Sequence, residues 1–503
     1  MPGKLEFEFG FGRPQEPTRR RSESALRILI MGDFSGRARQ VSPTPAAPLG
    51  ERRPIAIDID NFDTVLARFA PCAQLPLGDV EGATTTIAFR QLDDFHPDAL
   101  YGRAELLQGL RNTRARLANP ATCAEAAAEL LPSTPAPAEA KPASTQAESE
   151  GQMLDRLLGK PMTATTPSTP ATHPGIEQFI KRVIQPHIVA DANTRLPELL
   201  AGVDAAIGEQ MRGLLHQPAF QALEATWRGV NNLVTGLETD ELTVHLLDVT
   251  QQELVADVRA AAADLRQSGL YRVLVESART PGGEPWSLLV GDYYFGATAE
   301  DIALLAALGA LGAQAGGPFL AGARIELLGC ETTADLTDPS RWHSLTGESA
   351  QHWQRLRTHE LSRWLGLALP RMLLRLPYAE RSDPIESFDF EELPSSEQHD
   401  AYLWGNPAFA CAQLLGMAFM ENGWEMQPGD CLDIEDLPAY TFSAAGERCM
   451  QPCAEVLLGE RATQAILQRG IMPLLSYRNR NAARLARFQS LAEPAADLAG
   501  PWR

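Results

Sequence analysis

The sequence predicts a mixed α/β protein in which two α/β units are joined by a flexible linker. Three observations support this fold class. Strand-like apolar runs alternate with helix-like segments in both halves of the chain, a long stretch rich in Pro, Ala, Ser and Thr separates the halves, and 503 residues are enough for more than one buried core.

Composition limits the possible functions. Hydrophobic residues make up 44% of the chain and charged residues 21%, as in ordinary globular proteins. The formal net charge of -20 repels phosphate backbones and anionic lipids, so we expect no nucleic-acid partner and no direct membrane insertion. The N-terminus lacks a signal-peptide core and the apolar stretch at residues 302–311 is too short to span a bilayer, which predicts a cytoplasmic protein. Seven scattered cysteines, an odd number, favour reduced thiols.

The N-terminal unit is expected to span residues 1–123. Its first strand is the alternating run Leu5, Glu6, Phe7, Glu8 and Phe9, which has one apolar face. This run has no partner strand in a hairpin of its own, so it must pair with something outside that hairpin. Further strands are expected at residues 26–31, 55–59 and 84–92, and helices at residues 61–69 and 98–117.

The linker is expected at residues 124–173. Its composition cannot bury enough apolar surface to offset the entropy lost on ordering. Residues 153–158 form a short island whose apolar side chains share one face of a helical turn. One interpretation is a docking peptide with Leu154, Asp155, Leu157 and Leu158 as its contact residues. The alternative is a short helix packed on its own domain, and the spacing does not decide between them.

The C-terminal unit is expected to span residues 174–503. Helical spacing of apolar residues predicts helices at residues 176–188, 196–215 and 217–233. Strands are expected at residues 242–247, 271–276 and 286–290. Residues 301–314 form a nearly all-apolar helical segment, which should therefore be buried, and alternating strands and helices follow it.

No short pattern assembles a catalytic site. The glycine-containing turn at residues 32–36 lacks the lysine and spacing of a phosphate-binding loop, so a tight turn is the better interpretation. The acidic group at residues 93–98 contains a histidine, yet an acidic helix start explains it without a metal. Cys449 and Cys453 have no second metal-binding pair nearby. We therefore expect no catalytic residue, no cofactor, no metal and no enzymatic activity.

An acidic run lies near residue 390. Glu386, Asp389, Glu391 and Glu392 include two carboxylates that an acid–base pair would require. Such runs are usually solvated edges or salt-bridge partners of another subunit. We treat these four residues as candidates for inter-subunit electrostatic contacts.

Several segments of the C-terminal unit follow one another in a recognisable order: residues 220–229, 369–378, 388–392, 403–406, 437–438, 455–456 and 470–490. They resemble TssC, the large sheath subunit of bacterial type VI secretion systems, over about residues 176–491. Residues 5–9, 28–36, 57–62 and 92–100 resemble TssB, the small sheath subunit, over about residues 1–122. The family usually has two separate chains in a heterodimer. A single linker would fix their ratio at one to one and raise their effective concentration.

The resemblance implies a structural role. Sheath subunits polymerise around an inner tube of Hcp rings on a baseplate, and contraction expels the tube. It further implies that residues 5–9 are exchanged between neighbouring copies by strand addition, and that the island at residues 153–158 corresponds to the helix that binds the ATPase ClpV. The alternative is a non-propagating adaptor or a terminal subunit at the baseplate or sheath end.

One departure concerns the C-terminus. The family's large subunit continues past the region of residues 488–490 with further linking strands, whereas this chain ends at Arg503. We therefore expect a shortened large-subunit domain. It would belong to a compact sheath subunit of a divergent system, to a terminal or baseplate-side subunit, or to another contractile device.

Overall fold

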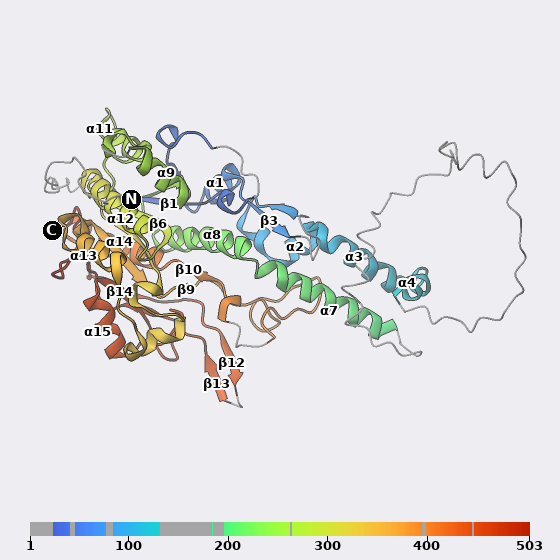
Figure 1. Cartoon of the computed structure of the whole chain (residues 1–503). Helices are drawn as coiled ribbons and strands as arrows, with labels where there is room; N and C mark the ends of the chain where they lie inside the picture. The colour runs from blue at the N-terminus through green and yellow to red at the C-terminus, as the bar shows by residue number, and fades with distance from the viewer. Residues whose placement is uncertain are drawn as a thin grey trace, which may run out of the picture. The chain divides into compact units, whose positions relative to one another are not determined.

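The computed structural model describes residues 24–40, 46–76, 84–130, 184, 196–261, 264–394, 399–444 and 447–502 (Figure 1). The candidate exchange strand at residues 5–9 and the candidate docking residues at 153–158 lie outside these ranges. So does the expected helix at residues 176–188, apart from Ile184. One compact unit combines Met1–Tyr101 with Met211–Arg503, and Gly102–Gln210 forms the other.

A nine-stranded mixed sheet forms the centre of the first unit, with strand order β11-β15-β14-β8-β7-β6-β1-β5-β2. The six strands from β14 to β5 run parallel, and β15, β11 and β2 are antiparallel to their neighbours. The strands are β1 Leu26–Gly32, β2 Ile55–Ile57, β5 Leu242–Asp248, β6 Leu288–Phe295, β7 Phe319–Ala323, β8 Leu365–Leu369, β11 Asp433–Ile434, β14 Ile471–Ser476 and β15 Ala483–Leu485. The predicted mixed α/β class is therefore confirmed.

The central strands are continuous apolar runs rather than alternating ones. Every residue of β7 and β8 is buried, and in β1 every residue except Arg27 is buried. This pattern is typical of parallel strands that are covered on both faces. Leu29 and Met31 belong to the core cluster around α12, Ala299–Ala315, so Ile28 and Ile30 point to the opposite face.

Helices cover the two faces of this sheet. On one face α12 packs against β6, β7 and β8, with α9 (Gln251–Ala261) and α13 (Gly347–Thr358) packed against it. On the other face α14 (Pro407–Asn422) contacts β1, β6, β7 and β8, and α8 (Pro218–Gly236) packs on α14. Both α12 and α14 are apolar all round, as expected for helices between a sheet and a second helix layer.

The N-terminal segment supplies the middle of the sheet. β1 pairs with β5 from Leu26 opposite Leu242 to Gly32 opposite Asp248, and its other edge pairs with β6. The two segments that the sequence separates by a linker thus interleave in one sheet. The central sheet of this unit forms only when strands more than 200 residues apart in the sequence pair with each other.

The remaining elements of this unit are shorter. Three two-stranded sheets are formed by β3 Cys72–Pro76 with β4 Thr84–Ala88, by β9 Met372–Leu373 with β10 Trp404–Gly405, and by β12 Thr441–Ala444 with β13 Glu447–Met450. The other helices are α1 Phe62–Phe69, α10 Gly269–Tyr271, α11 Ser277–Arg279 and α15 Glu460–Gln468, and α2 Pro97–Arg103 reaches the boundary of the unit.

The second unit is helical in its described part. It contains α3 (Glu105–Ala118), α4 (Cys123–Leu130) and the first fifteen residues of α7 (Leu196–Leu215). The α7 bounds agree with the prediction. Arg114 pairs with Asp204 at 2.5 Å, and Arg116 pairs with Glu129 at 2.8 Å.

One predicted strand is wrong. Residues 271–276 are helical, because α10, a π-helical turn at Arg272–Glu276 and α11 follow one another without a break. Ser268 accepts a hydrogen bond from the Tyr271 amide, and the Asp257 carboxylate accepts those of Gly269 and Leu270. These side chains satisfy the first amides of the helix, which an apolar run of six residues does not reveal.

Other predicted boundaries shift. β6 begins at Leu288 rather than at residue 286, and β4 ends at Ala88 before a 3₁₀ turn at Leu92–Phe95. The helix expected at residues 98–117 is divided into α2 and α3 by the extended Ala104.

Because β1 is hydrogen-bonded on both edges, we expect the chain to stay assembled after its connection is cut. A protease site inserted at residue 140 and cleaved under native conditions should give two fragments that co-elute in size-exclusion chromatography. The uncleaved chain with the same insertion is the control. Fragments that separate without denaturant would show that the sheet does not hold the two segments together.

Candidate functional site

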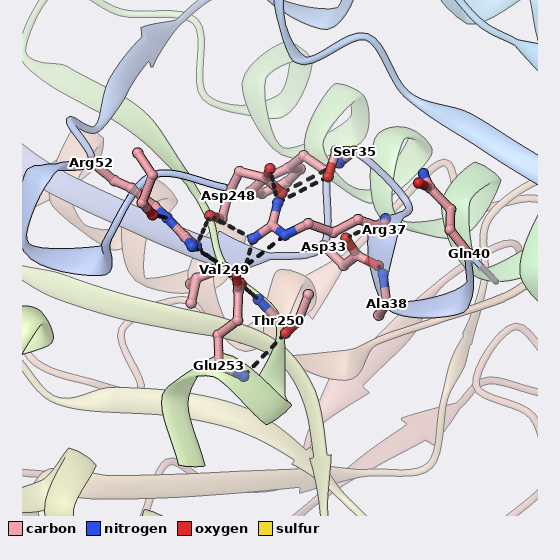
Figure 2. A network of polar contacts seen from close by, with 12 residues as sticks. Asp33, Ser35, Arg37, Ala38, Gln40, Arg52, Asp248, Val249, Thr250 and Glu253 are labelled. Atoms are coloured by element: carbon pink, nitrogen blue, oxygen red, sulfur yellow. Dashed lines mark hydrogen bonds and ion pairs between the residues drawn. The ribbon is translucent and has the colours of Figure 1, made fainter. Parts of the chain in front are cut away.

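A polar network joins the two segments at the carboxyl end of β1 (Figure 2). Arg37, in the turn after β1, forms an ion pair with Asp248 at the end of β5 and another, at 2.5 Å, with Glu253 of α9. Arg52, which precedes β2, reaches the same Glu253 at 2.6 Å. Two arginines of the N-terminal segment therefore hold two carboxylates of the C-terminal segment.

The turn at residues 32–36 positions Arg37. The Asp33 carboxylate accepts hydrogen bonds from the amides of Arg37 at 3.0 Å and Ala38 at 2.9 Å. Gly36 has a φ of 74°, and a Cβ there would lie 2.6 Å from the carbonyl oxygen of Cys72, so only glycine fits. The predicted tight turn is confirmed.

Electrostatics favour the ionised form of Glu253. Burial by itself raises the pKa of this carboxyl group. The hydrogen bonds from Arg52, Arg37 and the Thr250 amide outweigh burial and lower the pKa to about 2. Glu253 is therefore ionised at neutral pH, and the contact between the segments involves its full negative charge there.

An aromatic cluster lies beside this network. The Trp227 ring on α8 is fully buried, and its indole N–H donates to the carbonyl oxygen of Phe34 at 3.0 Å. The rings of Phe34, Phe62 and Phe69 from the N-terminal segment lie 5.5, 5.9 and 5.9 Å from it. Because its indole N–H is hydrogen-bonded and its ring is packed against other aromatic rings, Trp227 is well suited to anchor the contact between the two segments.

The acidic motif at residues 93–98 lies at a helix start, as expected, with Asp98 in the first turn of α2, and it also contacts a distant loop. The Asp98 carboxylate accepts hydrogen bonds from the amides of Glu386 and Ser387, both at 3.0 Å. His96 packs edge-on against Tyr378 with ring centroids 5.0 Å apart. These residues attach the N-terminal segment to the loop that carries the predicted acidic run.

A second, buried charge network lies behind this loop. Arg375 donates to Glu224 of α8 and to Glu392, both at 2.7 Å, and all three side chains are buried. Arg228 also pairs with Glu224 at 2.7 Å. The Tyr378 amide donates to Glu392 at 2.8 Å. Two arginines thus balance two glutamates inside the protein.

The structure separates the four predicted electrostatic candidates. Glu386, Asp389 and Glu391 are exposed, so their inter-subunit role stays a prediction. Glu392 is only 1% exposed and its carboxylate is occupied within the chain, so it is not available to another subunit. Burial raises the pKa of Glu392, but the charge of Arg375 and the surrounding hydrogen bonds outweigh it and lower the pKa to about 2.

Sequence reasoning missed Arg375 and Glu224. Their one local signal is a charged residue set among apolar neighbours, as in Leu374-Arg375-Leu376, and that pattern does not name a partner. A separation of 151 positions in the sequence hides the pairing of Glu224 with Arg375.

No helix in the described ranges is long and apolar enough to cross a membrane. Within the same ranges, no three His, Cys, Asp or Glu side chains are grouped so that they would hold a metal ion. Cys449 lies in the β12–β13 hairpin and Cys453 is buried, and both are free thiols.

The variant Arg375→Met should lower the free energy of unfolding by about 3–5 kcal/mol, because it leaves two buried carboxylates without their shared partner. Chemical denaturation measures the loss. The matched control is Arg480→Met, whose exposed pair with Glu435 should contribute about 1 kcal/mol or less. Equal losses in the two variants would contradict a structural role for the buried network.

Two family models match this chain. Residues 197–492 match VipB, described as the EvpB-type tail sheath N-terminal domain, and residues 15–130 match the type VI secretion system VipA family. β1 lies in the VipA match, and its neighbours β5 and β6 lie in the VipB match.

Two curated relatives come from Pseudomonas aeruginosa. The type VI secretion system sheath protein TssC1 is 32% identical over 315 residues, which cover 61% of this chain and 63% of the relative. The sheath protein TssB1 is 32% identical over 94 residues, which cover 18% of this chain and 52% of the relative. The chain thus spans less than two thirds of the length of either relative. Because the VipB match alone covers more than half of the chain and the VipA match precedes it, the chain belongs to the type VI secretion sheath family and joins a TssB-type segment to a TssC-type segment.

Proposed function

We propose that this chain is a structural subunit of a cytoplasmic type VI secretion sheath, which polymerises around the Hcp tube and contracts to expel it. The observation that carries the proposal is the interleaved sheet, in which the two sheath-type segments form one body. A chain built this way brings a matched small-and-large pair to every position of a polymer. Its partners are further copies of itself, the Hcp tube and the baseplate.

Within this proposal, residues 5–9 act as a donor strand and the hairpin of β12 and β13 in a neighbouring copy accepts them. Among the described strands, β12 and β13 pair only with each other, and their hairpin projects from the rest of its unit (Figure 1). An isolated two-stranded hairpin is marginally stable in water, and its free edges can bind a further strand. Tyr440 and Phe442, stacked 6.1 Å apart, give it an aromatic surface for the apolar face of the donor.

The exposed carboxylates of Glu386, Asp389 and Glu391 fit a supporting role in this assembly. They lie on a loop that the Asp98 carboxylate fastens to the N-terminal segment, so their position follows the body of the subunit. Charges held in this way steer the encounter of two copies and set their register more than they add affinity.

We further infer that residues 153–158 bind a ClpV-type ATPase during recycling of the sheath, through the apolar face formed by Leu154, Leu157 and Leu158. A peptide of residues 152–160 should bind the N-domain of that ATPase in a fluorescence-anisotropy titration, since an amphipathic turn can enter an apolar groove. The same peptide with Leu154→Ala and Leu158→Ala is the control. Absence of binding, or equal binding of both peptides, would remove the assignment.

Deleting residues 1–12 should leave a folded monomer but abolish tubes, because the donor strand is lost while the sheet is untouched. Negative-stain microscopy shows whether tubes form, and circular dichroism and thermal melting show whether the chain is folded. Intact tubes from the deletion would refute the donor-strand role. Monodisperse particles from the full chain would contradict the polymerising subunit and indicate a non-propagating adaptor.

A further inference from the structure

A cavity of about 730 Å³ lies over the carboxyl ends of the central strands. Asp33 follows β1, Asp292 lies in β6 and Arg324 follows β7, and all three line the cavity. Trp404 and Asn406, next to the start of α14, form part of its wall. Its volume is in the range of small-molecule sites.

The strand order explains why the sheet opens here. The chain leaves β5 on one side of β1 and continues to β6 on the other side, so the connections diverge at the end of β1. In open parallel sheets, a reversal of this kind creates a crevice outside the carboxyl ends of the strands, and ligands bind in that crevice.

Two guanidinium groups in this cavity form no hydrogen bond or ion pair with the described residues, although the charge of Arg39 acts on the Asp292 carboxylate. Arg39 and Arg324 are exposed, and no side-chain hydrogen bond or ion pair joins either to another described residue. Arg37, two positions earlier, is fully paired. Arg371 also lines the cavity, but Glu455 holds its guanidinium. Arg324 lies over Gly296, where a Cβ would meet its Cδ at 3.2 Å, so its stem extends across the end of β6.

The N-terminus of α8 adds further donors. Pro218 and Ala219, the first residues of this 19-residue helix, line the cavity. Gln217 before them makes no side-chain capping hydrogen bond. Pro218 has no amide hydrogen, so the first donor of the helix at the cavity is the Ala219 amide, which the Gln217 side chain does not cap, and the helix dipole favours negative charge at this end.

The carboxylates of the cavity are already used or lie at its rim. Asp33 accepts the amides of Arg37 and Ala38, and Asp292 accepts the Thr226 hydroxyl at 2.5 Å. Burial raises the pKa of both groups. Asp400 is exposed and opposes an anion. The charged groups of the cavity that form no ion pair with the described residues and carry positive charge are thus the exposed guanidinium groups of Arg39 and Arg324.

We propose that this cavity binds a small organic anion, whose phosphate or carboxylate oxygens are held by Arg39, Arg324 and the first turn of α8, with its carbon skeleton against Trp404. This inference does not rest on polymerisation, because the cavity and the side chains that line it belong to a single copy of the chain. Guanidinium groups and helix N-termini recognise oxyanions of both kinds.

Calorimetric titration of the full chain at constant ionic strength tests the site, with inorganic phosphate and pyrophosphate in one arm and malonate and citrate in the other. We expect saturable binding in at least one arm, and the arm that binds identifies the anion type. Arg39→Gln and Arg324→Gln should each weaken binding about tenfold, since each removes a charge-assisted hydrogen bond.

Arg381→Gln is the matched control, because Arg381 is exposed and does not line the cavity. It should bind like the unmodified chain, and thermal melting should show that all three variants stay folded. Absence of binding in both arms, or equal binding by the cavity variants and the control, would overturn the proposal. Tube formation is read separately by microscopy, so failure here leaves the sheath assignment untouched.

Discussion

Hydrogen bonding of β1 along both of its edges is the constraint on which the rest of the main unit depends. Without this strand, β5 and β6 would each present an unpaired edge, and the sheet would divide into two parts. The apolar side chains of β1 face both helix layers, so its insertion also completes both cores. The N-terminal segment is therefore a structural part of the C-terminal fold. The covalent link ensures that one N-terminal segment is present for each C-terminal segment, whereas strand pairing determines where that segment lies.

Charge and aromatic packing reinforce this insertion at different points. Arg37 and Arg52 both form ion pairs with Glu253. The Trp227 ring packs against three phenylalanine rings, and the Asp98 carboxylate accepts hydrogen bonds from the loop at residues 386–387. A buried ion pair adds little net stability over an apolar pair, but it penalises every arrangement in which one partner lacks the other. Such contacts suit a protein whose two segments must find one correct pairing.

The same topology leaves one end of the sheet open. Divergence of the connections at the carboxyl end of β1 produces a cavity, and the turn that places Arg37 in the network also places Arg39 at the cavity. The contact between the segments and the proposed anion site thus share a turn but use different side chains. The hairpin of β12 and β13, by contrast, pairs with no other described strand and is the acceptor in the strand exchange proposed above.

Local patterns were sufficient for the α/β class, the helix at 196–215 and the tight turn at Gly36, because each depends on neighbours in sequence, and the resemblance to sheath proteins identified the two segments. They failed at residues 271–276, where Ser268 and Asp257 cap a helix that a six-residue apolar run cannot distinguish from a strand. Only the tertiary structure decided that β1 lies between β5 and β6 and that Glu392 faces inward to Arg375. The sequence of an apolar parallel strand is equally apolar whichever strand lies next to it, and the sequence around a carboxylate does not reveal which arginine it pairs with. Both features therefore depend on contacts between residues that are distant in the sequence.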